Sequence, residues 1–142
     1  MRRCFLILAG MLLAACSPPD VDSTLEFQEA WVRATPPGAM MTASFGRLIN
    51  RTDASLEITA YTSPDYGDVS LHRTVIENGV SRMREAPELS IPPGGEIELA
   101  PGGYHLMLML PTQASGQHER VVLYIEEAGG RRFSFEIPVE RR

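Results

Sequence analysis

Two histidines and two methionines at long, fixed spacing are the residues of this chain best suited to chemistry. They follow the pattern His72, ten residues, Met83, twenty-one residues, His105, one residue, Met107, and are called here the His/Met set. Imidazole binds several transition metals, and thioethers are soft ligands that suit Cu(I). Structural zinc sites rarely use methionine. These residue types therefore favour a Cu(I) site that holds the ion without redox work.

Cysteine is absent from the part of the chain that we expect to fold. The two cysteines, Cys4 and Cys16, both lie near the N-terminus. A domain without thiols has no internal disulfide, no cysteine nucleophile and no thiolate ligand. Blue-copper electron transfer requires such a thiolate and is excluded. Because no familiar catalytic motif is present either, we expect a binding protein and not an enzyme.

Half of the His/Met set lies in the segment "YHLMLML", residues 104–110. Its strict alternation predicts a β-strand with His105, Met107 and Met109 on one face. The other face, which we expect to contact the core, carries Tyr104, Leu106, Leu108 and Leu110.

The other half flanks Asn78-Gly79, the preferred pair for a two-residue type I′ hairpin turn. With that turn Thr74 pairs with Met83, and His72 and Met83 become diagonal neighbours on one face, about 7–8 Å apart. A longer turn would move Met83 to the opposite face.

Short strand-like segments with Pro/Gly turns between them predict an all-β fold. Nine strands are expected, at residues 25–34, 41–50, 55–64, 68–77, 80–86, 96–101, 104–110, 119–128 and 132–140. Such a pattern is typical of a Greek-key β-sandwich or barrel. The length of 142 residues suits one domain, which we place at residues 26–142.

The first 15 residues have the features of a secretory signal: Arg2 and Arg3, an apolar run and small residues. The apolar run is shorter than the ~20 residues of a membrane-spanning helix. It ends in "LAAC", which resembles the lipobox of bacterial lipoproteins. That resemblance implies cleavage before Cys16, lipidation of its thiol and a tether at residues 16–25. A plain signal peptide with an incidental Cys16 is the alternative.

Two consequences follow for location and partners. In a Gram-negative source, Ser17 after the lipidated cysteine would imply the outer membrane. Removal of Arg2 and Arg3 from the 13 basic residues would leave 11 against 18 acidic residues, a net charge of −7. An acidic chain of this kind argues against a nucleic-acid partner.

The complete pattern H-x10-M-x21-H-x-M resembles the copper-binding signature of the periplasmic PCuAC copper(I) chaperone family. The segments "WVRATPPGAMMTASFGRLIN", "VSLHRTVIENGVSRMRE" and "IPPGGEIELAPGGYHLMLM" are also similar to that family, so the resemblance covers about residues 30–139. It implies a cupredoxin-like Greek-key β-sandwich in which His72, Met83, His105 and Met107 bind one Cu(I).

The resemblance also implies a role. Proteins of this family handle periplasmic copper and supply the CuA centre of cytochrome c oxidase, often alongside Sco-type thiol proteins. The chain would do so from the cell envelope, lipid-anchored and facing the periplasm. Two alternatives remain open. One is a copper buffer or scavenger without specific delivery, and the other is a metal-free structural β-sandwich lipoprotein.

Further histidine and methionine residues are open to two interpretations. Met109 shares the face of Met107 but lies ~6.5–7 Å further along, so packing competes with a role as auxiliary ligand. Met40 and Met41 follow a turn and are either a rim of the site or ordinary packing and surface residues. We expect His118 to be a solvated turn residue and Trp31 to pack. Arg73, Arg82 and Arg84 are solvated strand residues or guide docking.

Overall fold

The computed structural model describes residues 24–113 and 118–142, so Cys16 and most of the expected tether lie outside the described residues. The described part forms ten β-strands. They are β1 (Leu25–Arg33), β2 (Met41–Asn50), β3 (Leu56–Thr62), β4 (Tyr66–Glu77), β5 (Val80–Glu85), β6 (Leu89–Ile91), β7 (Glu96–Leu99), β8 (Tyr104–Pro111), β9 (Arg120–Glu127) and β10 (Arg132–Glu140). No helix long and apolar enough to cross a membrane occurs within these residues.

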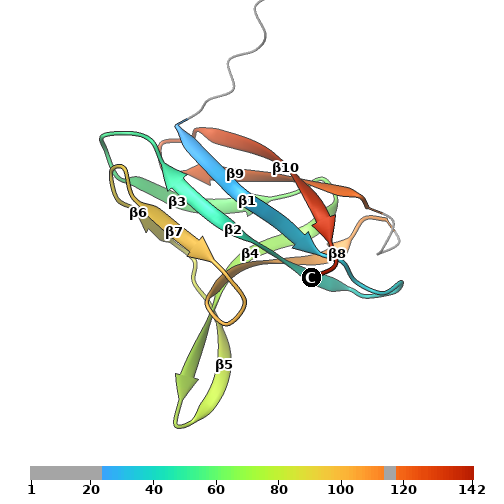
Figure 1. Ribbon diagram of the computed structural model, residues 1–142. Helices are drawn as coiled ribbons and strands as arrows, with labels where there is room; N and C mark the ends of the chain where they lie inside the picture. Colours follow the sequence, from blue (N-terminus) through green and yellow to red (C-terminus); the bar gives the residue numbers. More distant parts are fainter. Residues whose placement is uncertain (1–23, 114–117) are drawn as a thin grey trace, which may run out of the picture.

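The strands hydrogen-bond in the order β5-β4-β8-β7-β2-β1-β10-β9-β3-β6, and β8 also pairs with β2 (Figure 1). The sheet has two halves, one made of β5, β4, β8, β7, β2 and β1 and the other of β10, β9, β3 and β6. Most neighbouring strands are antiparallel, but β1 and β10, where the two halves join, pair in parallel. The long strand β2 pairs with β8 through its first half and with β7 through its second half. Strand β8 therefore lies between β4 and β2, in the interior of its half of the sheet.

One hydrophobic core draws on both halves of the sheet. Leu71 of β4 and Leu106 and Leu108 of β8 come from one half, and Ile58 of β3 and Leu123 of β9 from the other. All five side chains are fully or almost fully buried. Because residues of both halves belong to one cluster, the halves pack face to face, and the predicted all-β sandwich is confirmed.

The strand prediction needs two corrections. A tenth strand, β6, was missed because it is only three residues long and lies between Pro87 and Pro92. Leu110 was expected in the core but is 57% exposed. It adopts a left-handed φ of 57°, and its N–H donates to the carbonyl of Met40 at 2.9 Å. The alternation of β8 therefore ends after Met109.

The β4–β5 hairpin forms as the sequence predicts. Asn78 and Gly79 have φ angles of 53° and 75°, which suit a type I′ turn. The register pairs Thr74 with Met83 and His72 with Glu85. All six residues of β5 are exposed, and the strand is the edge of the sheet. The hairpin consequently projects from the body of the molecule (Figure 1).

Candidate metal site

His72 and His105 lie directly opposite each other on β4 and β8. Their rings stack with centroids 6.0 Å apart and planes inclined by 30°. Glu85 of β5 is the neighbour of His72 on the other side. Because Leu71 and Leu106 point into the core, the two imidazoles lie on the opposite face of the sheet, which is called here the outer face.

The backbone beside His105 fixes its ring. The Gly103 carbonyl accepts a hydrogen bond from the Thr74 N–H at 3.1 Å and lies 3.2 Å from Nδ1 of His105. A proton on Nδ1 donates to this carbonyl, so the lone pair of the ring is on Nε2. Nε2 is buried and has no hydrogen-bond partner among the described residues.

Burial also keeps the His105 ring neutral. The side chain is only 4% exposed, and desolvation lowers its pKa, with smaller contributions in the same direction from His72 and Arg33. The Gly103 carbonyl opposes this shift. A neutral imidazole with one free nitrogen is the form that binds a metal.

His72 has a corresponding arrangement. Its Nε2 lies 2.9 Å from the Ser70 hydroxyl, two residues earlier on the same face of β4. Its Nδ1 is buried without a hydrogen-bond partner in the described part of the chain. Unpaired buried nitrogens cost free energy, and one on each of two stacked rings calls for an explanation. A shared ligand ion would satisfy both.

A cavity of about 340 Å³ adjoins these rings. His105, Met107 and Met83 contribute to its wall, together with Met41 and Thr74. His72 is not part of this wall and is connected to it through the stacked ring of His105. Met107 packs against a small cluster of Trp31, Ala43 and Phe45, whereas Met83 is 52% exposed on the hairpin. Trp31 therefore packs, as expected.

A site built from harder ligands is not available in the described residues. No group of three or more His, Cys, Asp or Glu residues among them could hold a metal ion. The thioethers of Met83 and Met107 line the cavity beside His105 and are further donor atoms there. This donor set suits Cu(I) better than zinc or the harder divalent ions.

The three candidate auxiliary methionines differ in position: Met41 and Met109 lie in paired strands, and Met40 lies outside them. Met41 and Met109 are cross-strand partners on β2 and β8, and Met41 lines the cavity. Met40 precedes β2 and contributes its carbonyl to the hydrogen bond with Leu110. Met40 and Met41 are both well exposed.

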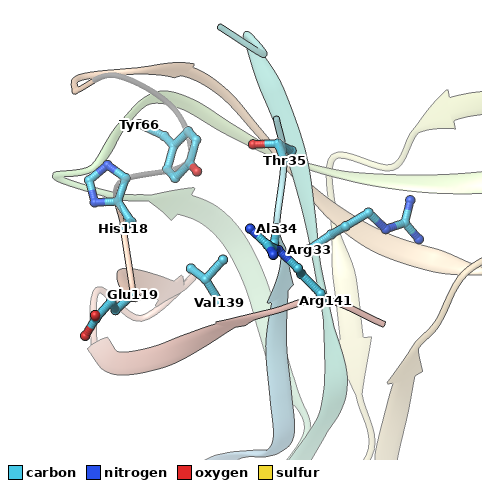
Figure 2. A pocket seen from close by; sticks show the side chains of 8 residues that line it. All are labelled: Arg33, Ala34, Thr35, Tyr66, His118, Glu119, Val139 and Arg141. Carbon is cyan, nitrogen blue, oxygen red and sulfur yellow. The ribbon is translucent and has the colours of Figure 1, made fainter. Parts of the chain in front are cut away.

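His118 is not the solvated residue that the sequence suggested. It is largely buried, with Nδ1 3.9 Å from a carboxylate oxygen of Asp65 and its ring near that of Tyr66. It lines a different cavity, also of about 340 Å³. Figure 2 shows His118 and Tyr66 on one side of that cavity and the Arg33 side chain extending away from them. His118 is therefore separate from the paired rings of His72 and His105.

The arginines near the hairpin occupy its other face. Arg82 and Arg84 both bridge to Glu77, at 3.4 and 2.9 Å. Arg73 lies over the ring of Tyr104. Since Met83 alternates with Arg82 and Arg84 along β5, their charges point away from the face that carries the methionine.

The residues that contact the two histidine rings are not among those predicted from the sequence. Ser70 and Gly103 each lie two residues before a histidine and contact its ring. The ring centroids of Phe45 and His105 are 6.3 Å apart. The Arg33 guanidinium lies over the ring of Phe45. Ser70 could have been predicted to contact His72, because residues two apart on a strand share a face. No pattern in the sequence predicts the contact of Phe45 with His105, because Phe45 comes from a distant strand.

Comparisons with known proteins agree with this architecture. The model of the family described as "Putative lipoprotein LpqE-like" matches residues 25–139. A curated relative, described as "Putative lipoprotein Lxx21020" of Leifsonia xyli subsp. xyli (strain CTCB07), is 37% identical over 97 residues. The match covers 68% of this chain and 57% of that relative, so the chain spans little more than half of the relative's length.

Two solved structures have a similar fold. The copper-bound PCuAC domain from PmoF2 superposes with a TM-score of 0.67 at 17% identity, covering 84% of this chain and 94% of that domain. The CuI-DR1885 structure from Deinococcus radiodurans gives a TM-score of 0.64 at 26% identity, covering 85% of this chain and 83% of that one. The described strands therefore have the cupredoxin-like fold of PCuAC domains.

Proposed function

The chain belongs to the LpqE-like family and has the PCuAC fold, and from this premise we propose that it is a Cu(I)-binding metallochaperone of the bacterial cell envelope. The ion is carried as cargo by His72, Met83, His105 and Met107. Two similar structures, copper-bound PmoF2 and CuI-DR1885, are named for copper, which supports the choice of cargo.

One observation carries the proposal. Two imidazoles stack at 6.0 Å, and each keeps a buried ring nitrogen without a hydrogen-bond partner among the described residues. Thioethers of Met83 and Met107 line the adjoining cavity. Ser70 and Gly103 each contact one nitrogen of a ring and leave the other nitrogen for an ion. The thioethers favour a soft ion.

Release is the second requirement of a carrier. The set contains no thiolate, so a partner that offers cysteine sulfur would hold Cu(I) more firmly and could take it by ligand exchange. Met83, on the exposed edge strand, is the ligand that such a partner can replace first. The chain itself performs no bond chemistry in this scheme, in keeping with a carrier and not an enzyme.

Anaerobic titration with Cu(I) tests the binding. The wild-type chain should bind one ion tightly, and the Met83→Leu/Met107→Leu double variant should lose that event. His118→Asn is the matched control, because His118 lies in a different cavity. Unchanged binding by the double variant would show that the ligands are misassigned. No binding by the wild type would favour the metal-free structural lipoprotein.

Transfer separates a chaperone from a copper buffer. The copper-loaded chain is mixed with an apo CuA domain of cytochrome c oxidase or with an apo Sco-type protein, and metal in each is followed after separation. Movement to either acceptor is expected. Retention by the chain in the presence of both would favour the buffer.

The N-terminal segment and the lipoprotein names of the family and of the relative support a location in the cell envelope. Residues 1–15 are a cleaved signal, Cys16 carries the lipid, residues up to 25 are a tether, and residues 26–142 are the copper-binding domain facing the periplasm. Incorporation of labelled palmitate into the chain, lost on Cys16→Ala, is the expected result. Equal labelling of the wild-type chain and the Cys16→Ala variant would refute lipidation at Cys16. Fractionation would then test whether Ser17 directs the chain to the outer membrane.

A further inference from the structure

Three side chains outside the His/Met set lie in one row across the outer face of the sheet. Met109 of β8 pairs with Met41 of β2 on one side and with Asp68 of β4 on the other. They are called here the Met41–Met109–Asp68 row. It lies one strand repeat beyond Met107, whose own partners are Ala43 and Ser70. Directly opposite residues share a face, so all three side chains emerge on the same side as His105.

The two thioethers of this row can reach one ion. Cβ atoms of directly opposite residues in an antiparallel pair are about 4.5–5.5 Å apart. Methionine is unbranched, with three rotatable bonds, so the sulfurs of Met41 and Met109 can converge. Met41 is 55% exposed and Met109 is not fully buried, so an ion can approach from solvent. A pair of thioethers favours Cu(I) over harder ions.

Charge supports a cation at the same place. Asp68 is exposed and has no ion-pair partner among residues 24–113 and 118–142. Its carboxylate therefore contributes an uncompensated negative charge next to Met109. The Arg33 guanidinium lies over the ring of Phe45, and Arg33 lines the same cavity as Met41. A monovalent cation is consequently attracted to the Asp68 end of the face.

The row is continuous with the cavity of the His/Met set. Met41 lines the same cavity as Met83, His105 and Met107. Along β8 the α-carbons of Met107 and Met109 are ~6.5–7 Å apart. A soft ion at the row is thus one short step from the Met107 sulfur, with no part of the core between them.

We propose that Met41 and Met109, with Asp68 beside them, form a second and weaker Cu(I) position through which the ion enters or leaves the His/Met set. This inference rests on the proposed function, because it concerns the same cargo. Fewer donors and greater exposure make this position the weaker of the two. It gives an incoming ion soft ligands before the two imidazoles are reached.

The test is a Cu(I) titration of the full chain in detergent micelles under anaerobic reducing conditions. Methionine methyl groups are labelled with 13C and followed by NMR, and single Met→Leu variants assign the signals. The first equivalent should shift the methyl signals of Met83 and Met107. The second equivalent should shift those of Met41 and Met109.

The chain offers a matched control in Met40. It is 57% exposed and adjacent to Met41, but it precedes β2 and is not part of the cross-strand pair. The Met41→Leu/Met109→Leu double variant should lose the second binding event and keep the first. Met40→Leu should keep both. Asp68→Asn should weaken only the second.

The outcomes distinguish this inference from the proposed function. A second equivalent that leaves Met41 and Met109 unshifted overturns the second position. So does a Met41 signal that shifts with the first equivalent, because Met41 would then belong to the first site. If Met83 and Met107 never shift, the proposed function fails, and the row is still judged by the signals of Met41 and Met109.

Discussion

The two faces of β8 differ in what they can do, although they alternate along one strand. The inner face presents Leu106 and Leu108, both 0% exposed in the core shared by the two halves of the sheet. The outer face presents His105 and Met107, which line a cavity, so an ion in that cavity can reach their nitrogen and sulfur atoms. The core and the proposed ligands thus lie on opposite sides of one strand.

A second contrast lies within the His/Met set itself. His105 and Met107 are on an interior strand, where neighbours on both sides fix their positions. Met83 is on the exposed edge strand β5, which pairs with β4 alone among the described strands. His105 and Met107 are thus preorganised, whereas Met83 is accessible. This division suits an ion that must be held and then given away.

The largest effect should come from the inner face. Leu108→Ala is expected to lower the free energy of unfolding by about 2–5 kcal/mol, because it leaves a cavity in the core. Leu110→Ala is the matched control on the same strand. Its side chain is 57% exposed, and the change should stay within about 0.5 kcal/mol. Urea denaturation measures both, and equal losses would contradict the break in alternation after Met109.

The next effect concerns the fixed half of the outer face. His105→Asn is expected to weaken Cu(I) binding by at least about 100-fold, since loss of groups that merely orient ligands already costs 10–100-fold. Competition with a Cu(I) chelator of known affinity gives the value. His118→Asn should retain wild-type affinity, as His118 lies in the other cavity. Equal loss in the two variants would remove the distinction between the cavities.

Met83→Leu should have a smaller effect than Met107→Leu. Its exposed side chain must be ordered on binding, and this entropy cost reduces its net contribution. We expect about a tenfold loss of affinity, which corresponds to about 1.4 kcal/mol, mainly as faster release. Stopped-flow transfer to a chelator measures that rate. An affinity loss for Met83→Leu larger than that for Met107→Leu would reverse the assignment of the two halves.

The smallest effect is expected at Tyr61, a buried polar residue of the inner core. Burial raises the pKa of its phenol, and the hydroxyl has no hydrogen-bond partner among the described residues. A raised pKa gives stability that is present below the unfolded value of about 10 and is lost as the pH rises above it. Tyr61→Phe should therefore be nearly neutral at pH 7 and reduce the alkaline loss.

Denaturation curves between pH 9 and 11 measure this loss. Tyr66, whose pKa is also raised by burial and by Asp65, stays in the variant and keeps part of the pH dependence. An unchanged slope in Tyr61→Phe would show that the phenol does not ionise on unfolding in this range.

The sequence by itself determined the features that depend on near neighbours. Asn78-Gly79 set the turn and hence the pairing of Thr74 with Met83, because only a two-residue turn with positive φ fits there. The alternation in β8 separated Leu106 and Leu108 from His105 and Met107, because successive side chains point to opposite faces. The resemblance of their spacing to the PCuAC signature predicted the four residues as a set, although it could not show where they lie.

Only the tertiary structure decided how distant segments meet. The pairing of His72 with His105 joins strands far apart in the chain, and its register depends on packing of Leu71 and Leu106 in the core. The same packing placed Met41 beside Met109, buried His118 next to Asp65 and turned Leu110 outward. Such contacts are fixed by the whole core and not by local preference, so no short stretch of sequence could reveal them.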